Sequence, residues 1–323
     1  HMRIAIVGMG GDIGTGVALR FDKDRETSML GIDMEPPRRR IRRAIFHRVD
    51  PADVEERTRL LVDFDPEFII HAGIYEPHSR SNPHDAEIRT RAATRSVFRA
   101  ARGCPSLRQI VMRSSTDVYG RSNVGANPQA VLGTDLQPHS RFGQMMADAE
   151  DVAVDFSKQR PDIGVTALRF APIVGPYIPS PLGRYLRLPF VPTGPLFFEG
   201  KFQLVHIDDV HEAFVAAVRA RAGGAFNIAG EGTVRGSEAA RIGRRPFIPT
   251  WGPGWLVARA ATAMFGAPLS EHSIESLTHG QAVSTEAAKR ELSFVPAHST
   301  RECIEDLYNW ESVVRLEVDR SVA

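Results

Sequence analysis

The chain has 323 residues, of which 42% are hydrophobic, and its 40 basic residues nearly balance 39 acidic ones. A chain of this length can bury a large core, as one large domain or two interlocked ones. The net charge of +1 gives no general attraction for nucleic acid or a membrane surface. Two cysteines, Cys104 and Cys303, provide neither a disulfide framework nor a metal-ligand pattern. Without an apolar run that could span a bilayer and without a signal peptide, we expect a cytoplasmic protein.

The N-terminal segment predicts a dinucleotide-binding turn. An apolar run at 3–7 is followed by glycines at Gly-x-x-Gly-x-x-Gly spacing, which predicts a strand, a tight turn and a helix. Such glycines let the backbone approach a pyrophosphate, and the helix that follows offers its first amide groups and the positive end of its dipole. The residues expected to contact the cofactor here are Gly8, Gly11, Asp12, Ile13 and Gly14.

The second predicted strand, 28–33, ends in Asp33. An acidic residue about 20 positions after the glycines binds the adenosine ribose hydroxyls in dinucleotide-binding folds. A carboxylate there favours NAD, because it repels the 2′-phosphate of NADP. Five arginines between 38 and 43 blur this preference, since one of them could pair with a phosphate, although a solvated basic loop is the simpler interpretation.

Further strands are predicted to end at Asp50, at Ala72 and Gly73, and in the stretch Ser114-Ser115-Thr116-Asp117-Val118-Tyr119-Gly120. With these segments in this order, the chain resembles the extended short-chain dehydrogenase/reductases, the NAD-dependent epimerase/dehydratase group. The resemblance continues through Gln203-Leu204-Val205-His206-Ile207-Asp208-Asp209-Val210, then 225–228, 284–296 and Trp310.

This resemblance implies a Rossmann-type α/β fold, a doubly wound parallel sheet with a smaller, interleaved C-terminal portion. The dinucleotide-binding domain would comprise 1–170 plus about 203–230, and the substrate-binding portion 171–202 and 231–323. Asp50 would contact adenine, Ala72 and Gly73 would pass under the cofactor, and Ser115 with Thr116 beside it would be the active-site hydroxyls. A homodimer formed through the predicted helices 86–102 and 142–159 is also implied.

The group's Tyr-x-x-x-Lys pair, in which the tyrosine moves the proton and the lysine lowers its pKa, is missing. Phe142 and Met146 occupy the tyrosine and lysine positions. Neither side chain can donate or accept a proton. The chain has four lysines, and none has a tyrosine four residues before it. The usual acid–base chemistry is therefore excluded whatever the alignment.

Among the groups that could replace the missing tyrosine, Tyr75 is the best phenol, because it lies just past the fourth strand and near the expected nicotinamide. Without a neighbouring lysine its pKa should remain near ~10, which makes it a poor base at neutral pH. His71 and Tyr119 more often have structural roles at such positions. Where the group holds a sugar-nucleotide diphosphate with arginine, this chain has Phe202. Core packing or a pocket for an apolar substrate would explain this phenylalanine and its neighbours Phe190, Phe197 and Phe198.

Three functions remain open. The first is an NAD-containing isomerase, dehydratase, lyase or cyclase that uses Ser115, Thr116 and Tyr75 and acts on a small molecule, with apolar substrates among the alternatives. The second is a catalytically inactive NAD-binding sensor or partner subunit. The third, a sugar-nucleotide epimerase, is least favoured, because positioned proton transfer contributes about 10²–10⁴ in rate and both of its usual residues are absent.

Overall fold

The computed structural model describes residues 1–76, 82–121, 131–178, 181–195, 198–267, 274 and 277–309. Phe197 and Trp310 of the sequence analysis lie outside these ranges. Among the helices described, none is both long and apolar enough to cross a membrane.

A seven-stranded sheet in the order β11-β6-β5-β4-β1-β2-β3 forms the centre of the larger part of the molecule. All of its neighbouring strands are parallel. The strands are β1 (Met2–Val7), β2 (Thr27–Asp33), β3 (Ala44–Arg48), β4 (Phe68–His71), β5 (Gln109–Ser115), β6 (Gly164–Phe170) and β11 (Gly224–Ile228). The direction of winding reverses between β1 and β4, and ligands of such sheets bind at the carboxyl ends of the strands there. The expected Rossmann-type sheet is confirmed.

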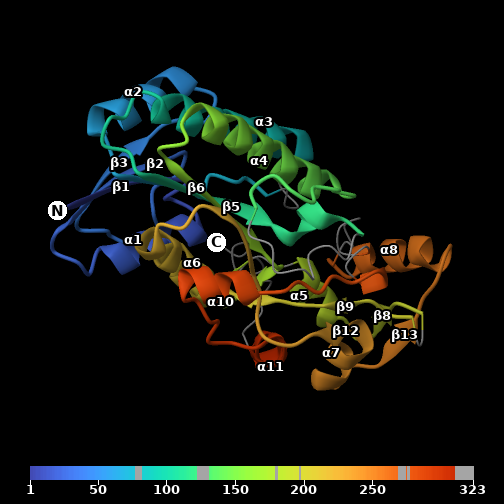
Figure 1. Cartoon of the computed structure of the whole chain (residues 1–323). Coiled ribbons are helices and arrows are strands. Elements are labelled where there is room, and N and C mark those ends of the chain that lie inside the picture. Colours follow the sequence, from blue (N-terminus) through green and yellow to red (C-terminus); the bar gives the residue numbers. More distant parts are fainter. Residues whose placement is uncertain are drawn as a thin grey trace, which may run out of the picture.

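Helices cover both faces of this sheet (Figure 1). One face carries α2 (Val54–Phe64), α3 (Pro83–Ala101) and α4 (Arg141–Gln159), and the other carries α1 (Asp12–Phe21), α6 (Ile207–Ala220) and α10 (Glu286–Leu292). Side-chain caps fix where α3 and α4 begin, since Asn82 accepts the His84 N–H and Ser140 accepts the Gly143 N–H. Each face buries its own apolar cluster, because strands of a parallel sheet are covered on both sides.

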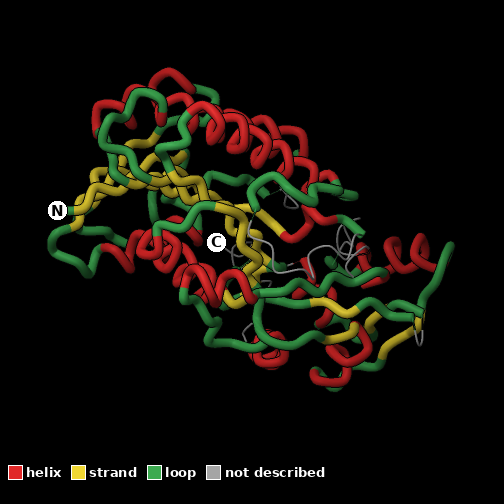
Figure 2. The backbone as a smooth tube through the Cα atoms, viewed as in Figure 1, coloured by secondary structure: helices red, strands yellow, loops and turns green. Residues whose placement is uncertain are grey.

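The remaining elements form a smaller part with short strands (Figure 2). Its strands pair in three two-stranded sheets: β7 (Ile173–Val174) with β10 (Val205–His206), β9 (Lys201–Phe202) with β12 (Val234–Arg235), and β8 (Val191–Thr193) with β13 (Phe247–Pro249). Its helices are α5 (Pro181–Leu186), α7 (Gly236–Ile242), α8 (Gly254–Met264) and α11 (Thr300–Asn309). A separate apolar cluster that includes Tyr185, Leu204 and Ile304 holds this part together. The chain leaves the main sheet after β6, returns for α6 and β11, leaves again, and returns once more for α10, which contacts α6 and β11.

Candidate cofactor and active site

The glycine turn after β1 packs directly against the end of β4. Gly8 has a φ of +89°, a conformation that side chains disfavour, and a Cβ built on it would lie 2.6 Å from backbone atoms of Ala72 and Gly73. A Cβ on Gly14 would lie 2.0 Å from the Gly8 carbonyl oxygen. Gly8 and Gly14 are therefore required by the protein's own backbone contacts.

Gly11 differs from these two glycines. It is the N-cap residue of α1, with extended backbone angles of −73° and 168° and no side-chain cap. A Cβ built there meets only the Gly8 carbonyl oxygen, at 3.6 Å. The fold therefore does not require glycine at this position. A missing side chain at an uncapped helix N-terminus leaves the first-turn amides accessible to an anion, which fits a pyrophosphate.

Asp33 ends β2 with its side chain turned toward this loop and is 7% exposed. Its Oδ2 accepts the Gly10 N–H at 2.9 Å, while Oδ1 accepts the Met34 N–H at 2.7 Å and the Tyr75 hydroxyl at 3.1 Å. With two donors already on Oδ1, Oδ2 is the oxygen with a lone pair left for a ribose hydroxyl. The expected adenine contact, Asp50, is an exposed residue whose Oδ1 accepts the Ala52 N–H.

Tyr75 lies elsewhere than we expected. Its hydroxyl donates to Asp33, at the expected ribose-binding end of the site, instead of pointing toward the nicotinamide end. Its backbone N–H donates to Thr90 Oγ1 at 2.9 Å, which orients the residue. Burial, and then the charge of Asp33, raises the pKa of the Tyr75 phenol well above its usual value. A phenol in this environment is a poor proton carrier, so we do not retain it as a substitute for the missing tyrosine.

His71 has the structural environment that the sequence favoured. It is fully buried at the end of β4, and its Nε2 lies 2.8 Å from Thr94 Oγ1. Burial, with a smaller contribution from Arg57, lowers the pKa of His71 to about 3. The ring is therefore neutral in the folded protein at any pH where an enzyme works.

We expect His71 to destabilise the fold in acid. In the unfolded chain His71 takes up a proton near pH ~6.5, whereas the buried ring of the folded protein stays neutral. The contribution of the neutral ring to the free energy of unfolding is therefore fully present above that pH and is lost as the pH falls. Between pH ~6.5 and ~5 this should reduce the free energy of unfolding by about 1.5 kcal/mol. Urea denaturation of His71→Gln across the same range should show a correspondingly shallower slope. Parallel slopes for variant and wild type would contradict the assignment.

Ser115 ends β5, and its hydroxyl is paired with the acid that follows. Ser115 Oγ donates to Asp117 Oδ2 at 2.9 Å and also accepts the Asp117 N–H. Thr116 is 3% exposed and begins the short helix η1 (Thr116–Tyr119). The sequence identified the serine, but nothing in it showed that Asp117 would turn back to hold the serine hydroxyl.

Phe142 and Met146, in the first turns of α4, lie next to this serine turn. The helix start packs tightly on η1, since a Cβ on Gly143 would lie 2.6 Å from the Asp117 carbonyl oxygen. Phe142 is half-buried, whereas Met146 is completely buried among apolar residues of the core. Both side chains therefore contribute packing at the start of α4.

A second acid near the strand ends was missed by sequence reasoning. Arg113 of β5 forms an ion pair with Glu76, which follows β4. The arginine side chain is only 10% exposed and the glutamate 49%. In the sequence, only position could have indicated this ion pair, because both residues lie at or near the carboxyl ends of adjacent parallel strands.

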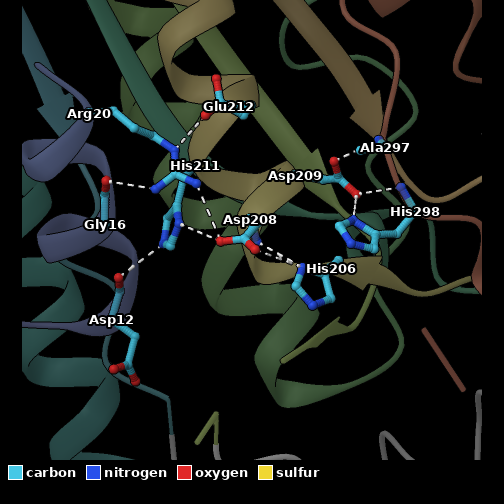
Figure 3. A network of polar contacts seen from close by, with 10 residues as sticks. All are labelled: Asp12, Gly16, Arg20, His206, Asp208, Asp209, His211, Glu212, Ala297 and His298. Atoms are coloured by element: carbon cyan, nitrogen blue, oxygen red, sulfur yellow. Dashed lines mark hydrogen bonds and ion pairs between the residues drawn. The ribbon is translucent and has the colours of Figure 1, made fainter. Parts of the chain in front are cut away.

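A polar network joins α6 to the loop before α11 and to α1 (Figure 3). Asp209 accepts the N–H groups of Ala297 at 2.7 Å and His298 at 3.0 Å, and it lies 2.9 Å from His298 Nδ1. On α1, His211 Nε2 contacts the Asp12 carbonyl oxygen at 3.1 Å, and burial lowers the pKa of His211 to about 4. Asp209 thus links α6, which covers the main sheet, to the loop that leads into the smaller part.

His206, His298 and Asp306 bring ligand-type atoms within 4.8 Å of one another. However, His206 Nδ1 accepts the Asp208 N–H at 3.1 Å, so the neutral ring carries its proton on Nε2. A protonated nitrogen is not a metal ligand. In addition, the imidazoles of His206 and His298 stack on each other with their centroids 4.0 Å apart. We assign this cluster a structural role.

The cysteine thiols offer no alternative nucleophile. Cys104 and Cys303 are both buried, and burial raises the pKa of each to about 12. Reactive cysteines instead have lowered pKa values and partial exposure.

Solved structures with this fold include sugar-nucleotide enzymes. The UDP-glucose 4-epimerase of Stenotrophomonas maltophila, solved with NAD and a formylated UDP-arabinopyranose, superimposes with a TM-score of 0.72 at 15% identity over 100% of both chains. The UDP-Glc/GlcNAc 4-epimerase of Campylobacter jejuni gives 0.73 at 15% identity, covering 96% of this chain and 99% of the other. The dTDP-glucose 4,6-dehydratase of Bacillus anthracis, in complex with NAD, gives 0.67 at 15% identity over 96% of each chain. Identities this low establish the fold alone.

Relatives and a family model establish membership. Uncharacterized proteins of Mycobacterium tuberculosis and Mycobacterium bovis are 30% identical over 277 residues, which covers 84% of this chain and 72% of the relatives. The model of the NAD dependent epimerase/dehydratase family matches residues 4–229, the segment that contains the glycine turn, Asp33 and the Ser115 turn. The chain therefore belongs to the NAD-dependent epimerase/dehydratase family.

Proposed function

We propose that this protein is an enzyme that holds NAD and acts on a small molecule as an isomerase, dehydratase, lyase or cyclase. It would do so without the Tyr-x-x-x-Lys pair. The observation that carries the proposal is the bonded pair Ser115–Asp117 at the end of β5. The resemblance assigns the family's active-site serine to Ser115, so this pair would supply a hydroxyl and a carboxylate beside the start of α4, which carries Phe142. The proposal thus combines the family's cofactor with an ionisable group that can carry a proton.

The residues around the glycine turn fit NAD. The uncapped N-terminus of α1 at Gly11 would receive the pyrophosphate, Asp33 Oδ2 would accept a ribose hydroxyl, and Asp50 would face adenine. When bound, the nicotinamide supplies a site that can accept or return a hydride. NAD is preferred over NADP because Asp33, which already accepts three hydrogen bonds, would repel a 2′-phosphate.

The Ser115–Asp117 pair offers a route for a proton. Ser115 Oγ donates its hydrogen to Asp117 Oδ2 and accepts the Asp117 N–H, which leaves one lone pair on Oγ. A substrate hydroxyl that donates to this lone pair can pass its proton to Oγ as the serine proton moves to the carboxylate. Asp117 then holds the proton, and the reverse movement returns it. A carboxylate reached through serine replaces the phenol that Phe142 cannot supply.

The substrate region supports a ligand other than a sugar nucleotide. Phe202, where the resembling enzymes have a diphosphate-binding arginine, is 2% exposed and packs in the core of the smaller part. Arg187, another possible phosphate ligand, instead donates through Nε to the Leu307 carbonyl oxygen at 3.1 Å. Because a diphosphate carries about two charges that recruit arginine, these contacts favour a substrate without one.

Ser115→Ala should eliminate turnover and leave NAD affinity within about twofold, because its hydroxyl lies at the chemical end of the site and general acid–base catalysis contributes ~10²–10⁴ in rate. Asp117→Asn is the matched variant: it keeps the size of the side chain but cannot take up the proton, so it should lose a similar factor. Product formation with candidate substrates and NAD titration are the measurements. Full activity in both variants would reject the proton route, whereas wild-type protein that holds NAD but transforms nothing would favour a sensor or partner subunit.

We also infer a homodimer formed through α3 and α4. The two helices are tied together by the ion pairs Arg91–Asp148 and Arg141–Glu87. Each also exposes a large apolar side chain, Ile88 at 49% and Val152 at 42%. Sedimentation velocity should detect a dimer that Ile88→Glu shifts toward monomer, since a buried unpaired charge opposes association. A wild-type monomer at micromolar concentration would contradict this inference.

A further inference from the structure

Helix α8 exposes an apolar face. Its inner side is formed by Trp255, Ala258 and Thr262, which are at most 8% exposed. Leu256 and Val257 are 70% and 71% exposed, and Met264 is 86% exposed. At about 100° per residue, 256, 257, 260 and 264 fall on the face opposite the buried one. A surface helix normally turns charged residues outward, and α8 has only one charged residue, Arg259.

Other exposed apolar side chains flank α8 in the sequence. Trp251, just before α8, is 68% exposed and Phe265, just after it, is 60% exposed. Ile248 of the preceding strand β13 is 51% exposed. Single exposed apolar residues are common on proteins, but a run of them in one short segment marks an interaction site.

The charge of the same segment has one sign. Residues 239–267 contain Arg241, Arg244, Arg245 and Arg259 and no aspartate, glutamate or lysine. All four arginines are exposed. In a chain with 40 basic and 39 acidic residues, such a stretch is a local excess of positive charge that the net charge of +1 does not reveal. Its complement is a negatively charged, partly apolar partner.

We propose that α8 and the loop before it dock in the plane of an anionic lipid bilayer. Exposed leucine, valine, methionine and aromatic side chains flanked by arginine, with no acid, match the composition of interfacial helices. The 11-residue helix is about 16 Å long at 1.5 Å per residue, too short to span a bilayer, so it lies on the surface. Figure 1 places α8 at the opposite end of the molecule from β3 and the N-terminus. The proposal does not depend on the catalytic assignment.

Vesicle co-sedimentation of the full chain tests this docking. The anionic vesicles contain phosphatidylcholine and phosphatidylglycerol at about 7:3, which gives a negatively charged surface. They should bind the protein at least tenfold more tightly than vesicles of phosphatidylcholine alone. Leu256→Glu with Val257→Glu should abolish binding, and Arg244→Gln with Arg245→Gln should weaken it roughly fivefold per arginine. Ile45→Glu is the matched control, since Ile45 of β3 is 65% exposed at the other end of the molecule. It should bind like wild type.

Three results would overturn the proposal. Wild-type protein that stays in solution with anionic vesicles is one, and equal binding by the α8 double variant is another. The third is a wild-type protein that binds no vesicles but self-associates in sedimentation velocity, with the self-association lost in Leu256→Glu with Val257→Glu. A second copy of the chain would then cover the face. Since all substituted residues are exposed, thermal melts should confirm that each variant is folded.

Discussion

Replacing Gly11 with aspartate is expected to eliminate NAD binding and leave the fold intact. The backbone at Gly11 is extended, and a side chain there meets only one atom within 4 Å, at 3.6 Å. Aspartate is moreover a favoured N-cap residue, so the apoprotein should melt at the wild-type temperature or slightly above it. In the complex, however, the carboxylate would stand where the pyrophosphate approaches α1, and repulsion at this distance should weaken affinity at least 100-fold.

Gly11→Asn is the matched control, because asparagine caps a helix as well as aspartate does and has nearly the same size. It separates charge from bulk, and we expect it to bind NAD more weakly than wild type but much more tightly than Gly11→Asp. Calorimetric titration with NAD and a thermal melt of each apoprotein give the two quantities. If Gly11→Asp bound NAD normally, the pyrophosphate would not lie at the start of α1.

Gly14→Ala provides the contrast within the same turn. Its Cβ would lie 2.0 Å from the Gly8 carbonyl oxygen, so this variant must destabilise the apoprotein itself. The glycine pattern in the sequence therefore combines two requirements that only the structure separates. Gly8 and Gly14 permit the backbone contacts, whereas Gly11 leaves space for a ligand.

The second large effect is expected from Glu150→Ala. Glu150 of α4 and Arg169 of β6 form a buried pair with 0% and 2% of their side chains exposed. Arg169 donates to both carboxylate oxygens, at 2.9 and 2.6 Å, and Ser114 donates to the same carboxylate at 2.6 Å. Removing the glutamate leaves the guanidinium buried without its counter-charge, which should reduce the free energy of unfolding by about 3–5 kcal/mol.

A double variant shows whether this cost comes from the pair or from the orphaned charge. Glu150→Leu with Arg169→Met removes both charges and retains apolar volume, so it should recover most of the stability lost in the single variant. Urea denaturation followed by circular dichroism measures all three proteins. A single variant as stable as wild type would mean that solvent reaches Arg169, contrary to its burial.

The sheet was predictable because its signals are local. Apolar runs ending in Gly8, Asp33 and Ser115 indicated strands of a parallel sheet, and the structure places these residues at the carboxyl ends of β1, β2 and β5. The helix boundaries were accurate to a few residues, since the caps Asn82 and Ser140 act within their own turns. Family membership followed from the serial order of these motifs.

Contacts between distant segments were not predictable. Tyr75 is an example, because its position past β4 gives no sign of the hydrogen bond that turns its hydroxyl toward Asp33, 42 residues away in the chain. The partner of Glu150 was equally hidden, since a glutamate on a helix is ordinarily solvated. Phe202 showed the reverse: the sequence allowed either core packing or a pocket, and its 2% exposure supports core packing.

Mass spectrometry of small molecules released by denaturing freshly purified protein shows whether the cofactor site is occupied. We expect NAD or NADH in near-stoichiometric amount from the wild type and none from Gly11→Asp purified in parallel. A wild-type protein that releases no nicotinamide dinucleotide and shows no thermal shift with added NAD would contradict the claim that the glycine turn and Asp33 form a working cofactor site.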